Sequence, residues 1–354
     1  MLFRSQYMLY KSIHELRLGK SEFARKARKR MCLQHDVLQR DERTKMVFDL
    51  EMHLAVLCES LIFDSSKIFF DYATWTQQLI ACKGKEPTGF EKCLQAIEIQ
   101  LLETAEGDWI SKAQQYITQA REQLHEELVM PDTYIESSKP YGNLALGYLK
   151  SCLKLRKGEA THKISMAIEE GASVQDIYAH VITPVLYEIG RLWHLNKISH
   201  GMEHYCTAVA QTVMTQIFPI LFDGTEKTKK IAFTCVAGEL HEIGARLVCD
   251  LFELQGWDSL FMGSDISAES VIDMVIQHGA TVLGISVTLC SNLSVAFDLI
   301  NEIRCHPRCD NLRIMVGGAG FDVDDQLWKK MGADGWARSS EEAIQLASTW
   351  GAQP

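Results

Sequence analysis

Hydrophobic residues along this chain follow two different periods, and the change between them falls close to residue 229. Before that position they recur at the spacing of an amphipathic helix through 46–80, 91–104 and 108–129. Strand-type alternation is absent from these stretches. The pattern predicts an N-terminal helical bundle over residues 41–135.

A second helical group is separated from the first by a stretch rich in Pro, Ser, Tyr and Gly between residues 131 and 142, which is typical of a linker. Short connections place consecutive helices beside each other. The sequence therefore predicts a compact four-helix domain over residues 142–225, closed by the turn Asp223-Gly224-Thr225. Its expected helices are 142–155, 157–170, 174–192 and 199–218.

From residue 229 onward, short apolar or β-branched runs alternate with amphipathic segments of helical length. This alternation is typical of a parallel sheet with helices on both faces. We therefore expect an architecture of α/β plus all-α type, in which the two helical regions precede a flavodoxin-like doubly wound parallel five-stranded sheet over 229–354. The expected strands are Ile231–Val236, Ser259–Met262, Val282–Ser286, Arg313–Val316 and Gly335–Ala337.

Charge is distributed unevenly along the chain, whose formal net charge is −10. Residues 1–45 contain 12 basic and 5 acidic side chains, a net charge of +7, and the remainder carries −17. The acidic balance argues against direct DNA binding as the main function. Residues 1–40 are expected to form a basic helical arm with a solvated face, and docking on an acidic partner or a nucleic acid is the alternative.

The N-terminus lacks the continuous apolar core of a secretory signal. The longest apolar stretch, near residues 209–222, is interrupted by polar residues and too short to span a bilayer. Eleven cysteines without regular spacing are typical of a reducing compartment. The sequence therefore predicts a cytoplasmic protein without membrane contact.

The first candidate functional loop follows the run Ile231–Val236 and reads Gly238-Glu239-Leu240-His241-Glu242-Ile243-Gly244. Ligands of open α/β sheets bind at the carboxyl ends of the strands, so His241 is expected to face a ligand. Glu239 is placed to hydrogen-bond the second ring nitrogen, as carboxylates beside metal-bound histidines do. A helix-capping loop with a solvated histidine is the alternative for this motif taken alone.

Two further loops are expected at the same edge of the sheet. Ser286-Val287-Thr288 ends the third run with small hydroxyl side chains, and Gly317-Gly318 follows the fourth run without any side chain. Together with His241 they describe a slot that has one metal-capable imidazole at its mouth. The glycines alone are equally typical of a structural or phosphate-binding turn.

The order of these three loops resembles the signature of cobalamin-binding domains that hold the cofactor in its base-off form. The resemblance implies that His241 is the lower axial ligand of cobalt and that Glu239, which stands where Asp is usual, orients it. It also implies that Leu240 contacts the cofactor. The residues implied to line the slot for the nucleotide tail are Gly244, Ser286, Thr288, Gly317 and Gly318.

The four-helix domain contains Trp193-His194 and, with nine residues after the tryptophan, Glu203-His204. This spacing resembles the light-sensing adenosylcobalamin photoreceptors. The resemblance implies that Trp193 covers the adenosyl group, with Glu203 and His204 beside it. His194 would capture cobalt from above once light breaks the cobalt–carbon bond. His200 replaces the small aliphatic residue of the family, and this third imidazole would compete with His194 or favour a cobalamin without adenosyl.

Residues 1–140 do not resemble the winged-helix DNA-binding domain that many such photoreceptors carry. The aromatic stretch Phe69–Trp75 is instead similar to the helical domain of photocobilins, which add a bilin pigment such as biliverdin. Aromatic residues at helical spacing are more often part of a core. His53 and Cys58 would be pigment contacts only if a bilin is bound.

The sequence thus predicts a cobalamin-binding photoreceptor, not an enzyme, in which light changes the helical cap, a homo-oligomeric assembly or the contact with an unidentified downstream protein. One alternative is a corrinoid methyl-carrier protein of a methyltransferase system, which needs the same His241 but not the Trp193 pattern. The other is a regulator that senses cobalamin without photochemistry.

Overall fold

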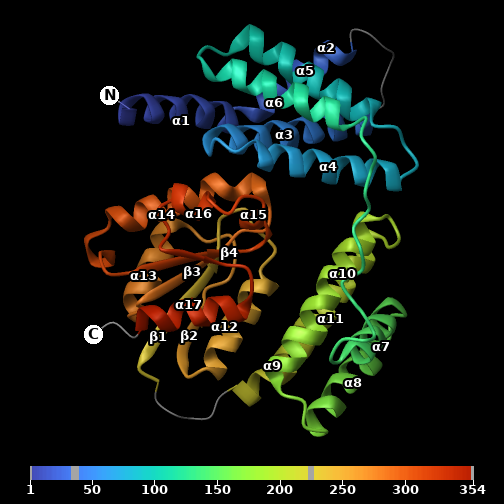
Figure 1. The fold of residues 1–354 in the computed structure, drawn as a ribbon, viewed down its shortest axis with the longest axis vertical. Helices are drawn as coiled ribbons and strands as arrows, with labels where there is room; N and C mark the ends of the chain where they lie inside the picture. Colours follow the sequence, from blue (N-terminus) through green and yellow to red (C-terminus); the bar gives the residue numbers. More distant parts are fainter. Residues whose placement is uncertain (1, 33–39, 222–226, 352–354) are drawn as a thin grey trace. The chain divides into compact units, whose positions relative to one another are not determined.

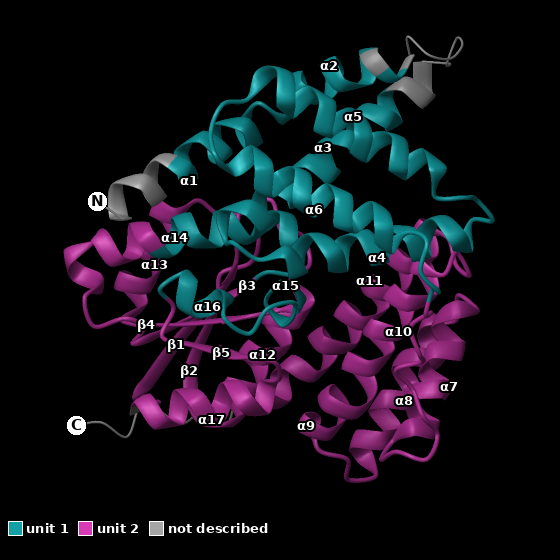
Figure 2. Ribbon diagram, turned by 45° about the horizontal axis from the view of Figure 1, so that its top comes forward, with its two compact units in different colours: residues 1–128, 287–300, 319–332 teal, residues 129–286, 301–318, 333–354 magenta. Residues whose placement is uncertain are grey.

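A computed structural model of the chain describes residues 2–32, 40–221 and 227–351 (Figure 1). It divides into two compact units, coloured separately in Figure 2. The helical unit comprises residues 1–128, 287–300 and 319–332, and the sheet unit comprises residues 129–286, 301–318 and 333–354. This division differs from the ranges expected from the sequence. Residues 287–300 and 319–332, which follow two strands of the sheet, belong to the same unit as the N-terminal helices.

The helical unit is built from the N-terminal helices and from the segments that follow two strands. The N-terminal helices are α1 (Leu2–Leu18), α2 (Lys20–Cys32), α3 (Arg40–Ile62), α4 (Ser66–Cys82), α5 (Thr88–Thr104) and α6 (Trp109–Gln123). The later segments contribute the start of α14 (Leu293–Cys305), together with α15 (Ala319–Asp322) and α16 (Leu327–Lys330).

The first two helices belong to the core of the helical unit and do not form a separate arm. Ile13 of α1 and both Ala24 and Ala27 of α2 have no exposed surface. Arg25 and Lys26 of α2 are exposed. The basic cluster therefore lies on the solvated face of a helix whose other face is buried.

The predicted helical stretch 46–80 consists of two helices, α3 and α4. Asp64 between them has a left-handed backbone with φ of 46°, and Ser65 is extended, so the chain changes direction at this point. Apolar residues continue on both sides of the turn, because α3 is buried on all sides from His53 to Leu61 and α4 buries one face. Periodicity alone therefore does not mark the break.

A buried carboxylate joins these helices to the segment that follows β3 (Val282–Ser286). The Glu59 side chain of α3 has no exposed surface, and it accepts hydrogen bonds from the backbone N–H and the hydroxyl of Ser294, both at 2.8 Å. Arg17 of α1 forms a 2.8 Å ion pair with Glu59 and donates to the Ser291 carbonyl at 2.8 Å. Ser294 lies in the first turn of α14, so the carboxylate also meets the positive end of that helix. Burial outweighs these partners and raises the pKa of Glu59 to about 7.

A second group of contacts joins the helices to the segment that follows β4 (Arg313–Gly317). The Ser65 hydroxyl donates to Asp324 at 2.7 Å, and the Lys330 ammonium donates to the Phe63 carbonyl at 2.8 Å. Asp324 and Lys330 are themselves 3.6 Å apart in an ion pair. The turn between α3 and α4 is thereby fixed to the region of α15 and α16.

The sheet unit contains the predicted cap helices and the parallel sheet. The helices are α7 (Gly142–Leu153), α8 (Lys157–Glu169), α9 (Val174–Ile177), α10 (Thr183–His194), α11 (His200–Ile217), α12 (Ile243–Leu254), α13 (Ala268–His278) and α17 (Ser340–Gly351). The remaining strands are β1 (Lys229–Cys235), β2 (Trp257–Phe261) and β5 (Gly335–Ala337). A π-helical segment, Tyr178–Ile182, joins α9 to α10. The predicted turn at 223–225 lies outside the described residues.

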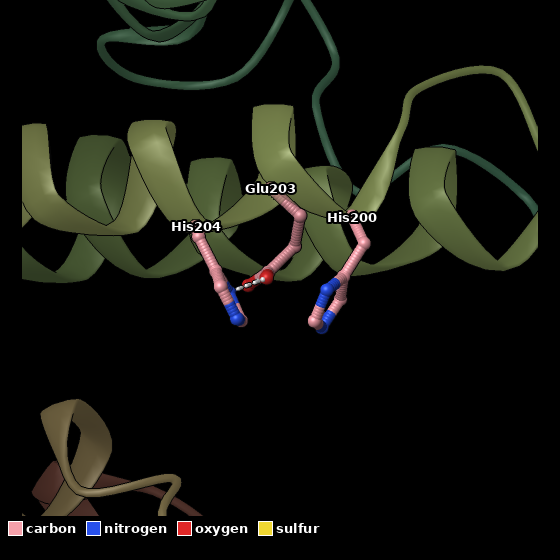
Figure 3. Close-up of side chains that lie close together, drawn as sticks. All are labelled: His200, Glu203 and His204. Carbon is pink, nitrogen blue, oxygen red and sulfur yellow. Dashed lines mark hydrogen bonds and ion pairs between the residues drawn. The ribbon is translucent and has the colours of Figure 1, made fainter.

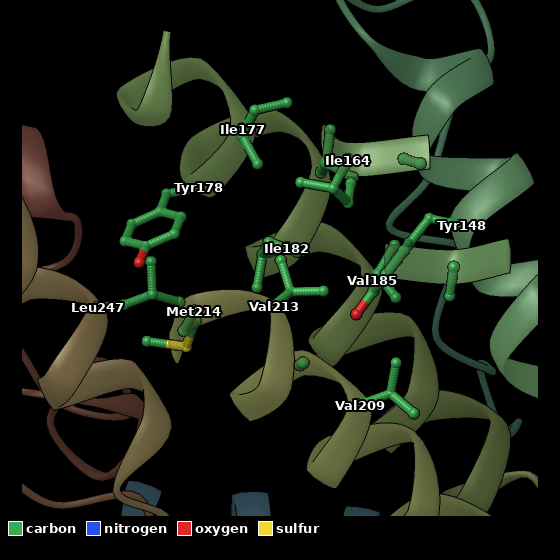
Figure 4. Packing of buried hydrophobic residues seen from close by; sticks show 14 of the residues in the cluster. Tyr148, Ile164, Ile177, Tyr178, Ile182, Val185, Val209, Val213, Met214 and Leu247 are labelled. Atoms are coloured by element: carbon green, nitrogen blue, oxygen red, sulfur yellow. The ribbon is translucent and has the colours of Figure 1, made fainter. Parts of the chain in front are cut away.

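The cap helices share one hydrophobic core with α12 of the sheet region (Figure 4). Leu247 of α12 lies close to Tyr178 and Met214 in this core. The Tyr178 hydroxyl donates to the buried carboxylate of Asp250 at 3.0 Å. Burial raises the pKa of Asp250 to about 6, and the hydrogen bond from Tyr178 opposes this effect.

The sheet has five parallel strands in the order β2-β1-β3-β4-β5, which confirms the predicted doubly wound fold. Hydrophobic side chains of the strands pack in one buried cluster with side chains of α12 and α17. Gly284 of β3 pairs with Phe233 of β1, and a Cβ on Gly284 would lie 2.3 Å from the Phe233 ring. The close packing of the two strands therefore requires glycine at this position. No helix within the described ranges is long and apolar enough to cross a membrane.

Replacing Glu59 by alanine should loosen the start of α14. The Glu59→Ala variant leaves the charge of Arg17 and the N–H of Ser294 without their partner, which is expected to cost about 3 kcal/mol. Hydrogen–deuterium exchange should then become faster in residues 287–300. Glu22→Ala, which removes an exposed ion pair with Lys26, is the control and should leave this exchange unchanged. Unchanged protection of 287–300 in Glu59→Ala would contradict the role given to Glu59.

Candidate functional site

The parallel strands bring three of the predicted loops to one edge of the sheet. Cys235 at the end of β1 is the register partner of Ser286 at the end of β3, and Ser286 is the partner of Gly317 at the end of β4. The connections that begin at these residues therefore leave the sheet side by side. His241 lies in the connection that follows β1.

Glu239 fixes both the position and the tautomer of His241. The Glu239 side chain has no exposed surface, and its Oε1 atom accepts hydrogen bonds from the His241 backbone N–H at 3.1 Å and from the ring Nδ1–H at 2.5 Å. A proton on Nδ1 leaves the lone pair of Nε2 free. The His241 side chain is 56% exposed. The loop thus presents an oriented imidazole that can accept a metal at Nε2.

The loop that carries His241 is held by residues that the sequence analysis missed. Gly238 adopts a φ of 78° and donates its N–H to Asp265 at 2.9 Å. The Ser264 hydroxyl donates to Glu242 at 2.9 Å. Ser264 and Asp265 follow β2, so their place just after a predicted strand was the signal that would have identified them.

Nearby carboxylates raise the pKa of His241 above its ordinary value of 6.5. The hydrogen bond to Glu239 is the largest cause, burial opposes it, and the charges of Glu239 and Glu203 add to the increase. Glu203 belongs to α11, so the cap contributes to the electrostatic environment of the histidine.

The surface next to His241 is partly apolar and open. Leu240 is 76% exposed. Gly244, near the start of α12, is also exposed, and a Cβ on it would meet no atom within 4 Å. Contacts within the protein therefore explain neither the exposed leucine nor the glycine. Both fit a bulky ligand that lies over the loop, which is the role the resemblance implies.

The other predicted slot residues have mixed environments. Ser286 and Thr288 are both half-buried, but Thr288 belongs to the helical unit. A Cβ on Gly317 would approach the Ala337 carbonyl oxygen to 3.0 Å, and Gly318 has a φ of 92°. The backbone alone thus favours glycine at both positions, whether or not they flank a cofactor.

The predicted residues of the cap fall into two environments. His200, Glu203 and His204 project from the same side of α11 (Figure 3). The Trp193 ring lies 6.4 Å from the His200 ring, measured between centroids, so it borders the same group. His194 is 6% exposed. Its predicted capture of cobalt would require a change in the surroundings of its side chain, whereas His200 and His204 are already exposed.

The residues named as pigment contacts lie in the core of the helical unit. His53 is 6% exposed, its Nδ1 lies 2.7 Å from the Tyr72 hydroxyl, and its ring centroid lies 4.6 Å from that of Phe90. Burial lowers the pKa of His53 to about 3 and raises the pKa of the Cys58 thiol. Both predicted pigment contacts are therefore buried among residues of this unit.

Comparison with known proteins relates the two C-terminal regions to cobalamin binding. A family model described as a B12 binding domain matches residues 229–345, and a second with the same description matches residues 145–217. Monomethylamine corrinoid protein 2 of Methanosarcina acetivorans is 31% identical over 190 residues, which cover 51% of this chain and 85% of that protein. A corrinoid protein of Desulfitobacterium hafniense is 30% identical over 124 residues, 35% of this chain and 56% of that relative.

Among solved structures, the monomethylamine corrinoid protein of Methanosarcina barkeri is similar with a TM-score of 0.53 and 20% sequence identity, covering 59% of this chain and 98% of that chain. This likeness shows a shared fold. The names of the relatives agree with the expected cobalamin cofactor. They favour the alternative prediction of a corrinoid protein over the photoreceptor, and they support neither the adenosyl form nor a bilin.

Replacing Glu239 by glutamine should lower the pKa of His241. In the Glu239→Gln variant the new amide oxygen can still accept the Nδ1–H bond, but the negative charge that raises the pKa is gone. A raised folded-state pKa stabilises the protein below pH 6.5, and this contribution is lost as the pH rises through the folded-state pKa. Ring nitrogen NMR titration of wild type and Glu239→Gln would measure the shift, and identical His241 titrations would refute the assignment.

The buried Glu239 and the exposed His241 lie in the loop after the carboxyl end of β1, within one of the two matched B12-binding regions. The second matched region is the four-helix cap that precedes it. A relative at 31% identity is matched over 85% of its length. This chain therefore belongs to the family of B12-binding corrinoid proteins.

Proposed function

We propose that this protein is a corrinoid carrier, which binds cobalamin in its base-off form with His241 as the lower cobalt ligand and carries methyl groups between proteins of a methyltransferase system. The observation that carries this proposal is the Glu239–His241 pair, with a fully buried carboxylate, an Nδ1–H donor and an exposed ring. Neutral imidazole with one nitrogen oriented by a carboxylate is the usual form of a metal-bound histidine.

The residues around the pair fit a large planar ligand. When bound, the cofactor supplies a cobalt atom that accepts and releases a methyl group. His241 would offer its Nε2 lone pair to the cobalt, while Glu239 holds the Nδ1 proton and keeps the ring in one orientation. Leu240 offers an exposed apolar surface, and Gly244 leaves the space above the start of α12 free. Trp193 at the end of α10 supplies an aromatic surface in the cap that excludes water.

The class of partners follows from the chemistry of a carrier. A carrier has no use for a substrate pocket of its own, because one partner delivers the methyl group and another removes it. Several matched relatives are named monomethylamine or dimethylamine corrinoid proteins, which supports a methylated amine as the source. An acceptor protein with a thiol substrate completes the proposed sequence.

Removal of the imidazole tests the lower ligand. His241→Ala should weaken cobalamin retention at least about tenfold and abolish the absorption spectrum of the His-on form. His162→Ala, which removes an exposed histidine of α8, should leave both unchanged. An unaltered His-on spectrum in His241→Ala would disprove the axial assignment.

A transfer assay tests the carrier role. Protein loaded with methylcobalamin should lose its methyl group to a thiol when a methyltransferase of the same system is added, and its absorbance should change in step with the product. His241→Ala protein with the same corrinoid content should transfer more slowly. The absence of transfer with every partner from the methylamine class would count against the carrier role.

A second candidate function is light sensing with adenosylcobalamin, and a specific group of side chains favours it. Trp193, Glu203 and His204 have the sequence spacing of the photoreceptor family, and His200 brings a further imidazole to the same face of α11. In this proposal light would break the bond between cobalt and the adenosyl group, the adenosyl group would leave, and an imidazole of the cap would be available to hold the cobalt. The resulting change in the cap would alter assembly or partner contact.

Illumination distinguishes this second function from the first. Adenosylcobalamin-loaded protein should show a lasting change of its cobalt spectrum after green light, and Trp193→Ala should bind the cofactor but give a different lit spectrum. Trp75→Ala, which removes an exposed tryptophan of the helical unit, serves as the control. Identical spectra and oligomeric states in dark and lit samples would exclude light sensing.

A further inference from the structure

The beginning of α11 gathers two imidazoles and a carboxylate on one side of the helix. Glu203 and His204 lie three and four positions after His200, so each is a neighbour of His200 on the helix surface, and the three side chains project from one side of α11 (Figure 3). His200 and His204 are exposed, and Glu203 is half-buried. Among the described residues this is the one group of three or more His, Cys, Asp or Glu side chains whose donor atoms converge.

The distances within the group are short enough for a common ligand. One donor atom from each residue lies within 4.8 Å of the other two. The ring centroids of His200 and His204 are 4.0 Å apart. His204 Nδ1 is hydrogen-bonded to Glu203 Oε2 at 2.5 Å, which leaves His204 Nε2 as the nitrogen available to an ion. The donor atoms of a tetrahedral zinc ion are about 3.3 Å apart, as follows from metal–nitrogen distances of about 2.0 Å. Donor atoms up to 4.8 Å apart would therefore have to move closer together around a bound ion.

The carboxylate of the group is held in place by the helix. Glu203 Oε1 accepts a hydrogen bond from the Thr207 hydroxyl at 3.0 Å, one turn further along α11. Ser199 caps the same helix and accepts the N–H of Met202, so the first turn has a defined geometry. Because the Thr207 hydroxyl donates to Oε1, it is the other oxygen, Oε2, that lies against the His204 ring. Such an outer hydrogen bond is the usual support of a metal-binding carboxylate.

The donor set selects the class of ion. Two imidazole nitrogens and one carboxylate oxygen are the ligands of zinc sites that keep a fourth position open. Imidazole suits Zn²⁺, Ni²⁺ and Cu²⁺, whereas Mg²⁺ and Ca²⁺ prefer sites made of oxygen atoms. The start of a helix repels cations, and the negative charge of Glu203 offsets this repulsion locally. Both the charge and the donor types of the group therefore favour a divalent ion such as Zn²⁺, Ni²⁺ or Cu²⁺ over Mg²⁺ or Ca²⁺.

We propose that His200, Glu203 and His204 form a binding site for a divalent transition-metal ion of the zinc, nickel and copper class, distinct from the His241 cobalt ligand. The ion has three protein ligands and one position open toward solvent. This proposal does not rest on the carrier function, because it concerns the chain without a corrinoid. The two functions proposed above would instead place a cofactor over the same face of α11.

Metal titration of the full chain, prepared without corrinoid, tests the proposal. Calorimetry with Zn²⁺ and with Ni²⁺ should reveal a site that His200→Ala and His204→Ala each weaken at least about tenfold. Glu203→Gln keeps the shape of the side chain and should weaken binding as well. His162→Ala removes an exposed histidine of α8 outside the group and should bind like wild type. Equal affinities of wild type and the three variants would overturn the site.

A spectroscopic measurement identifies the ligands directly. Copper bound to wild type should give an electron paramagnetic resonance spectrum with two nitrogen ligands, and His204→Ala should give one. Because His200 and His204 are exposed, the variants are expected to fold normally, which circular dichroism verifies. A copper signal that is the same in wild type and in the His200→Ala, His204→Ala double variant would equally refute the site.

Measuring both zinc and cobalamin binding in one variant distinguishes a failure of the metal site from a failure of the proposed function. His241→Ala removes the lower cobalt ligand but none of the three proposed metal ligands, so its zinc affinity should equal that of wild type. Loss of zinc binding in His241→Ala would overturn the assignment of the site to α11 alone. Failure of cobalamin binding with intact zinc binding would reject the corrinoid proposal and support the metal site.

Discussion

All five strands of the sheet run in the same direction, and this constraint decides where the candidate chemistry of the protein is found. Parallel strands have their carboxyl ends along one edge, so residues that are far apart in the sequence begin their loops side by side. Cys235, Ser286 and Gly317 are linked in register across three strands, and the loop of His241 starts from the first of them. A candidate ligand site made from separate motifs depends on this register.

Two fully buried carboxylates illustrate how the loops are fixed once they have left the sheet. Glu239 accepts a backbone N–H and a ring N–H from His241, and Glu59 accepts a backbone N–H and a hydroxyl from Ser294. A buried carboxylate is costly unless its oxygens are satisfied, so each of them restricts the segment that supplies its donors. In the first case the restricted segment carries the predicted metal ligand. In the second case it is the start of α14, which belongs to the helical unit.

Local signals gave the positions of most elements because they depend on one helix face or one strand at a time. The predicted helices 142–155, 157–170 and 199–218 differ from α7, α8 and α11 by at most two residues at their ends, whereas the predicted helix 174–192 consists of α9, the π-helical segment and α10. The predicted strands agree with β1 to β5 to within two residues at each end. The break at Asp64 was missed because the apolar spacing continues through it. The integration of α1 and α2 was also missed, since the buried alanines Ala24 and Ala27 carry a weak hydrophobic signal beside many basic residues.

The sequence by itself determined the class of fold and the identity of the ligand candidates, because the spacing of apolar residues and the residue types in strand-end loops are local properties. His241, Glu239 and the Trp193 to His204 pattern could all be named without coordinates. The tertiary structure decided which of them have access to a ligand: His200 and His204 are exposed, whereas His194 is buried. It also decided that Asp265 and Ser264 support the histidine loop and that Glu59 holds the start of α14. These contacts join residues far apart in the chain, and their formation depends on how the helices and strands pack, which no local pattern encodes.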